Sequence, residues 1–120
     1  PGREDLPPVM FGSHLDSVRN GGQLDGAYGV LGALEVLNTL CERQIETRHP
    51  LAVIAFTNEE GARYVPDMLG SLAYVGDLTV EEAWAVKGFD GSLFGEELER
   101  IGYAGEVQPG AIRPKGKEKP

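Results

Sequence analysis

Two apolar runs, residues 9–13 and 51–57, constrain the fold more than any other feature of this sequence. Neither run alternates apolar with polar residues, which is typical of strands that are buried on both faces. Between the runs, apolar side chains recur at helical spacing from about residue 27 to residue 41, at Val30, Leu34, Leu37 and Cys41. Strand, helix and strand in this order predict a βαβ unit with parallel strands and a right-handed crossover.

Short helices are expected in the rest of the chain. Residues 68–75 could form a short helix, and Thr79 with Glu82 has the pattern of a capping box that opens a helix ending near residue 86. Ser92 is expected to cap a further helix, which runs to Ile101 and places Leu93, Phe94, Leu98 and Ile101 on one face. The predicted fold class is therefore α/β, a parallel sheet built on a βαβ unit with flanking helices. Two strands leave sheet edges unpaired, so we expect this unit to belong to a larger domain.

Charge and composition exclude several classes of function. The chain has 120 residues and a formal charge of −8, from 11 Lys and Arg against 19 Asp and Glu, so its surface should repel nucleic acid. Residues 113–120 are basic and rich in proline, and we expect a flexible tail there. No apolar run is long enough for a membrane span. The single cysteine, Cys41, excludes an internal disulfide, is expected to be buried on the helix, and favours a reducing, cytoplasmic location.

Side chains that can bind metal follow both predicted strands. His14, Asp16 and Asp25 come after the first run, and Glu59 and Glu60 come after the second. Ligands bind at the carboxyl ends of parallel strands, where these two groups should meet. A pair of divalent ions needs imidazole or carboxylate ligands and usually one bridging carboxylate, while a further carboxylate can act as general base. Each residue also has an ordinary explanation as a solvated histidine, a turn or a solvated helix start.

Three segments in this order resemble a known family. They are Gly-Ser-His-Leu-Asp-Ser at 12–17, Asn-Gly-Gly-Gln-Leu-Asp-Gly-Ala-Tyr-Gly-Val at 20–30 and Ala-Phe-Thr-Asn-Glu-Glu-Gly-Ala-Arg-Tyr at 55–64. They resemble the zinc-dependent amidohydrolases of the M20 peptidase-like family, in the branch of N-carbamoyl-L-amino-acid hydrolase and allantoate amidohydrolase. The resemblance continues to about Gly105. It implies a phosphorylase/hydrolase-like three-layer metallopeptidase domain.

The resemblance also implies a role for each candidate residue. His14 would bind one metal ion, Asp25 would bridge two ions and Glu60 would bind the other ion. Glu59 would be the general base, and Asp16 would support His14. The ions would be zinc, or manganese, cobalt or nickel. The substrate would be a small molecule, an N-carbamoyl amino acid or a ureido compound such as allantoate, hydrolysed at a linear C–N bond.

The sequence departs from the family pattern in ways that affect these expectations. Two further histidine ligands and the family's dimerisation domain have no counterpart here, and Leu72 stands where an arginine is expected. Residues 1–112 would therefore be part of the catalytic domain, which alone should hold one ion or none and hydrolyse little. Two alternatives stay open: an M20-type aminopeptidase or deacylase, and a non-catalytic α/β unit that self-associates through its sheet edges.

Overall fold

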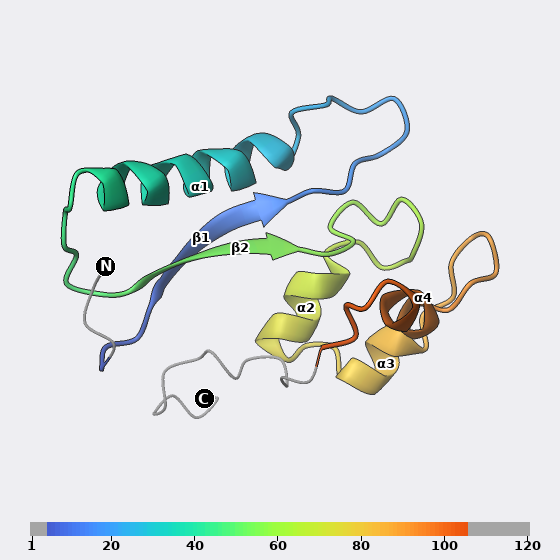
Figure 1. Ribbon diagram of the computed structural model, residues 1–120. Coiled ribbons are helices and arrows are strands. Elements are labelled where there is room, and N and C mark those ends of the chain that lie inside the picture. Colours follow the sequence, from blue (N-terminus) through green and yellow to red (C-terminus); the bar gives the residue numbers. More distant parts are fainter. Residues whose placement is uncertain (1–4, 106–120) are drawn as a thin grey trace.

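The computed structural model describes residues 5–105, which form two strands and four helices (Figure 1). In chain order the elements are β1 (Val9–His14), α1 (Ala27–Glu42), β2 (Leu51–Phe56), α2 (Leu69–Val75), α3 (Val80–Trp84) and α4 (Phe94–Arg100). The α/β class and the βαβ unit predicted from the sequence are confirmed.

β1 and β2 form a parallel two-stranded sheet. Val9 lies opposite Leu51, and His14 lies opposite Phe56, so both strands end at the same level. A side chain at Gly12 would collide with the carbonyl group of Ile54, so this glycine allows the two backbones to approach. This register brings the loops that follow the two strands to the same end of the sheet, where both strands have their carboxyl ends.

Helices cover the sheet from two sides. α1 runs along one side, and α2, α3 and α4 lie on the other (Figure 1). The core between the short helices consists of Tyr64, Leu69, Ala83 and Phe94, and the rings of Tyr64 and Phe94 meet edge to face at 5.1 Å. Leu69 is only 1% exposed, and burial of one such side chain contributes about 1.5–3 kcal/mol.

Burial differs from the sequence-based expectation in the βαβ unit. The strands are not buried on both faces, and Val9 is 51% exposed. Cys41, which was expected to be buried, is exposed. The buried residues of α1 are Val30 and Ala33, both in its first half. Two strands are too narrow to cover the whole apolar stripe of a sixteen-residue helix, so Leu37 and Leu40 in its second half are only half-buried.

The helix starts test the capping predictions. At α3 the capping box is confirmed, because the Thr79 hydroxyl accepts the Glu82 N–H while the Glu82 carboxylate accepts the Thr79 N–H. The predicted cap of α4 is wrong. Leu93 occupies the N-cap position without a side-chain hydrogen bond, and the Ser92 hydroxyl instead donates to Asp90.

Some expectations concern residues outside the described range. The basic tail at 113–120 and the expected domain limit at residue 112 lie beyond residue 105. Within residues 5–105, no helix has the length and apolar character that crossing a membrane requires.

Candidate metal centre

His14 is the last residue of β1, and the residue is buried, with only 7% of its surface exposed. Its Nδ1 lies 2.9 Å from the backbone carbonyl oxygen of Asp16. Because a carbonyl oxygen can only accept, Nδ1 carries the proton in this contact. In the neutral form of the ring, a proton on Nδ1 leaves the lone pair of Nε2 available, which is the form of histidine that binds metal ions.

The second part of the centre is the start of α1. Gly26 has a φ of 67° and packs against the His14 ring. A side chain at this position would overlap the ring. This glycine places the preceding residue, Asp25, beside the ring. Oδ1 of Asp25 lies 4.0 Å from Nε2 of His14, and the Asp25 side chain is 66% exposed. The predicted Asp25-Gly26 turn thus serves to bring a carboxylate to the imidazole.

The third part is the loop after β2, which carries the two adjacent glutamates. Oε2 of Glu59 lies 3.4 Å from Nε2 of His14. Glu60 is intermediate in exposure and contributes one carboxylate oxygen to the group described below. The parallel register accounts for this proximity, because residues just beyond paired strand ends emerge side by side.

The carboxylate of Asp16 joins the two loops. It accepts the backbone N–H of Glu59 at Oδ1 (3.2 Å) and that of Glu60 at Oδ2 (3.1 Å). Sequence reasoning expected Asp16 to hydrogen-bond the imidazole of His14. The structure makes that contact through the main-chain carbonyl, and the carboxylate oxygen lies 3.8 Å from Nδ1.

His14, Asp25 and Glu60 each offer one ligand atom, and these atoms lie within 4.8 Å of one another. One imidazole nitrogen and two carboxylate oxygens suit a divalent ion such as zinc, and the two carboxylates also suit manganese. The tautomer of His14, which leaves Nε2 free to bind, fits the same use. Three donor residues are better suited to holding one metal ion than to holding two.

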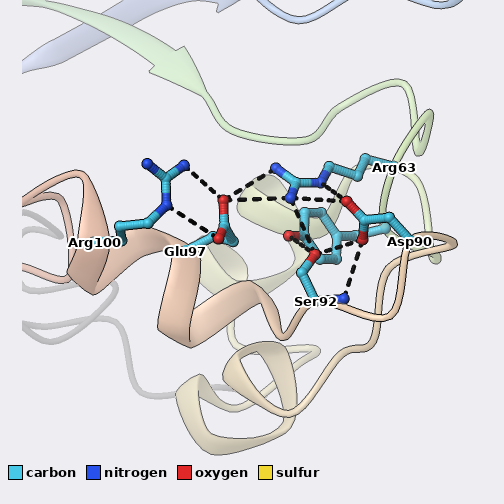
Figure 2. A network of polar contacts seen from close by, with 6 residues as sticks. Arg63, Asp90, Ser92, Glu97 and Arg100 are labelled. Carbon is cyan, nitrogen blue, oxygen red and sulfur yellow. Dashed lines mark hydrogen bonds and ion pairs between the residues drawn. The ribbon is translucent and has the colours of Figure 1, made fainter.

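A polar network between the loop after β2 and α4 was not predicted from the sequence (Figure 2). Arg63 donates to Asp90 (Nε to Oδ2, 2.9 Å), to the Ser92 hydroxyl (3.1 Å) and to Glu97 (3.3 Å). Arg100 donates to the same Glu97 carboxylate at 2.8 Å. Only the Arg-Tyr end of the motif at 55–64 could have indicated it, since its partners are distant in sequence.

This network has a consequence for protonation. The hydroxyl and backbone N–H of Ser92 hydrogen-bond to Asp90 and, with help from Arg63, lower the pKa of Asp90 to about 2. Arg100 lowers the pKa of Glu97 by hydrogen bonding. The network therefore stays ionised at neutral pH and ties the loop after β2 to α4.

Comparison with known proteins identifies the family. The family model described as Peptidase family M28 matches residues 1–110. The chain belongs to this family. The chain is similar to N-carbamoyl-L-amino-acid amidohydrolase of Rhizobium meliloti, with 48% identity over 107 residues, 89% of this chain and 26% of the relative. Ureidoglycolate hydrolase of Arabidopsis thaliana is 37% identical over 102 residues, 83% of this chain and 21% of that relative.

Solved structures agree with the sequence relatives. An amidase of the hydantoinase/carbamoylase family from Burkholderia multivorans superimposes with a TM-score of 0.88 at 50% identity, over 92% of this chain and 27% of that one. The expected resemblance to the carbamoylase branch is confirmed, and the matching family model bears the name M28 where the motifs suggested M20. The chain spans about a quarter of the length of the relatives that it matches.

Proposed function

We propose that the chain supplies one face of a metal-dependent centre that hydrolyses a linear C–N bond in an N-carbamoyl amino acid or a ureido compound such as allantoate. The observation that carries this proposal is the convergence of the His14, Asp25 and Glu60 ligand atoms within 4.8 Å. Relatives named as N-carbamoyl-L-amino-acid amidohydrolase, ureidoglycolate hydrolase and allantoate deiminase support this substrate class.

His14, Asp25 and Glu60 would hold the metal. When bound, a divalent ion polarises a carbonyl group and acidifies water, and family members of this kind would use a pair of ions, zinc or alternatively manganese, cobalt or nickel. In a two-ion site Asp25 would be the bridging ligand. With three donors, this chain alone is expected to hold a single ion.

Glu59 is the general base of the proposed reaction. Its Oε2 is 3.4 Å from Nε2 of His14, so Glu59 lies beside the metal ligands and would take the proton of a water molecule held there. Attack of that water on the carbamoyl carbon and return of the proton to the terminal nitrogen would break the bond to that nitrogen and release ammonia. An N-carbamoyl amino acid would thereby become an N-carboxy amino acid, a carbamate. Loss of carbon dioxide from this carbamate, with its carboxyl proton passing to the nitrogen, would then give the free amino acid.

A peptidase or deacylase of the same family is the second candidate, because the matching family model is named for peptidases. It would use the same residues on a different carbonyl compound. We also propose that the substrate is a small molecule. The whole protein would be located in the cytoplasm and would form a homodimer. The net charge of −8 argues against nucleic acid as a partner.

Metal stoichiometry tests the centre. We expect one zinc or manganese ion per chain by native mass spectrometry after loading and dialysis, and its loss in Asp25→Asn and in Glu60→Gln. Asp77→Asn is the matched control, because Asp77 is exposed and lies between α2 and α3. Equal metal retention by Asp25→Asn and wild type would contradict the proposed ligand set.

Ammonia release tests the substrate class. At high protein concentration the metal-loaded chain should act slowly on an N-carbamoyl amino acid, and Glu59→Gln should reduce that rate by about 100-fold or more. Faster cleavage of a dipeptide or an N-acyl amino acid would favour the second candidate. An N-carbamoyl activity that survives Glu59→Gln would remove Glu59 from the role of base.

A further inference from the structure

Asn58 stands between β2 and the two glutamates of the candidate centre, and the proposed chemistry gives it no role. It is only 7% exposed, although it lies in a loop. Its φ of 53° is left-handed, a conformation that asparagine adopts more readily than most residues. A buried polar side chain in this conformation needs hydrogen-bond partners inside the protein.

The side-chain amide of Asn58 closes the loop that follows it. Nδ2 donates to the backbone carbonyl of Tyr64 at 2.8 Å and to that of Pro66 at 3.1 Å. An amide nitrogen carries two hydrogens, so both are used. No aspartate could replace it there, because a carboxylate has no proton to donate and would face two carbonyl oxygens.

Main-chain hydrogen bonds hold the same segment from the other side. The carbonyl of Glu59 accepts the Met68 N–H at 2.6 Å, and the carbonyl of Asn58 accepts the Leu69 N–H at 3.2 Å. The N–H groups of Glu59 and Glu60 are taken by the Asp16 carboxylate. These hydrogen bonds together hold the backbone of Glu59 and Glu60 in one orientation, and they require the loop of residues 58–66 to be closed.

We propose that Asn58 is a positioning residue for Glu59 and Glu60. Its left-handed backbone turns the chain out of β2, and its amide closes the loop, so that the N–H groups of both glutamates reach Asp16. The carboxylate of Glu60 then lies near His14 and Asp25, as the metal centre requires. The effect of Asn58 on metal binding rests on the proposed function. Its effect on the backbone of Glu59 and Glu60 rests on geometry alone.

Amide hydrogen exchange by NMR on the metal-free chain gives the backbone readout. In wild type, the side-chain amide protons of Asn58 should exchange more slowly than those of Asn20, which is exposed and also has a left-handed φ, 61°. Equal exchange rates for these two side chains would overturn the proposal, and this comparison needs no variant to fold.

Variants separate the backbone conformation from the side-chain hydrogen bonds. Asn58→Gly keeps access to a positive φ but removes the amide, and Asn58→Asp keeps the shape but removes both donors. We expect protection of the Glu59 and Glu60 N–H groups to fall by about tenfold or more in both variants, with protection in β1 and β2 unchanged. Asn20→Gly and Asn20→Asp are the matched controls and should leave these amides within about twofold of wild type.

Two results of this experiment would overturn the proposal. Unchanged protection of Glu59 and Glu60 in Asn58→Gly would show that the backbone alone sets their direction. Loss of protection throughout the chain would show that Asn58 supports the fold as a whole rather than these two residues.

Titration with Co²⁺ gives the metal readout. Asn58→Gly should raise the Co²⁺ dissociation constant by about 10- to 100-fold, the usual effect of losing a residue that orients metal ligands. Absence of Co²⁺ binding in wild type would count against the proposed function, while the exchange measurement would still decide the role of Asn58. Wild-type affinity in Asn58→Gly would overturn the positioning role.

Discussion

Gly26 leaves room for the imidazole of His14 at the point where α1 begins. Its φ of 67° is unfavourable for other residues, and a side chain there would overlap the ring. The neighbouring ligand Asp25 gains its position from this turn. The distance between His14 and Asp25 thus depends on the absence of a single methyl group.

Replacement of this glycine is expected to affect metal binding as well as stability. Gly26→Ala should weaken Co²⁺ binding, because the imidazole must move away from Asp25. The control is Gly102→Ala, since Gly102 has a similar φ of 75° and, its chain neighbours aside, no atom of residues 5–105 lies within 4 Å of the added methyl group. Left-handed backbone alone costs about 1–2 kcal/mol, so Gly102→Ala should lose that much without a change in Co²⁺ affinity. Urea unfolding and Co²⁺ titration measure both effects, and equal losses in the two variants would contradict the prediction.

Residue types in the motifs indicated the candidate ligands, but not how they are held. His14, Asp25 and Glu60 could be named from the sequence because few side chains bind metal ions and these follow two strand ends. The contact between His14 and the carbonyl of Asp16 could not be predicted, because every residue has a carbonyl group. The role of Asn58 depends on a backbone angle that the sequence does not reveal.

At the scale of the elements, the helix caps show why the start of α3 was predicted correctly and the start of α4 was not. Thr79 and Glu82 satisfy each other within one turn, so their pattern is readable from the sequence. Ser92 has a competing partner, because Asp90 is two residues away and accepts both its hydroxyl and its N–H, at 2.6 Å and 3.1 Å. Long-range contacts to Arg63 and Tyr64 complete this alternative.

Removal of the Ser92 hydroxyl should raise the pKa of Asp90 from about 2 towards its ordinary value of 3.8. In wild type, Asp90 is more acidic in the folded state than in the unfolded state. Its contribution to stability is therefore present above pH 3.8 and is lost as the pH falls towards 2. Ser92→Ala should reduce that acid-dependent loss, as measured by NMR titration of the Asp90 carboxyl group and by unfolding at each pH.

Ser71→Ala is the control for this prediction, because the Ser71 hydroxyl donates to the backbone carbonyl of Met68 rather than to Asp90. It should leave the pKa of Asp90 unchanged. A pKa of about 2 that persists in Ser92→Ala would instead assign the shift to Arg63 and to the backbone N–H of residue 92.

At the scale of the whole molecule, the described residues leave much apolar surface in contact with solvent. The sheet has two strands, so each strand has one edge without a partner strand among residues 5–105. Neither strand carries a lysine, aspartate or glutamate, the residues with which edge strands usually resist pairing. Phe89, Tyr103 and Tyr28 are each more than 70% exposed. Local pattern predicted each strand, but the coverage of the sheet depends on how many strands it has.

Self-association of the isolated chain follows from these open edges. We expect the mass measured by light scattering to rise with protein concentration, because strand pairing satisfies backbone N–H and C=O groups that otherwise face water. Ala55→Lys places a charge at an exposed position of β2 and should lower the measured mass. Val36→Lys is the matched control, since Val36 is 49% exposed but lies on α1 rather than on a strand. A stronger effect of Val36→Lys would place the contact on α1. A chain that stays monomeric at every concentration and unfolds cooperatively would show that the two-stranded sheet is stable with its edges in water.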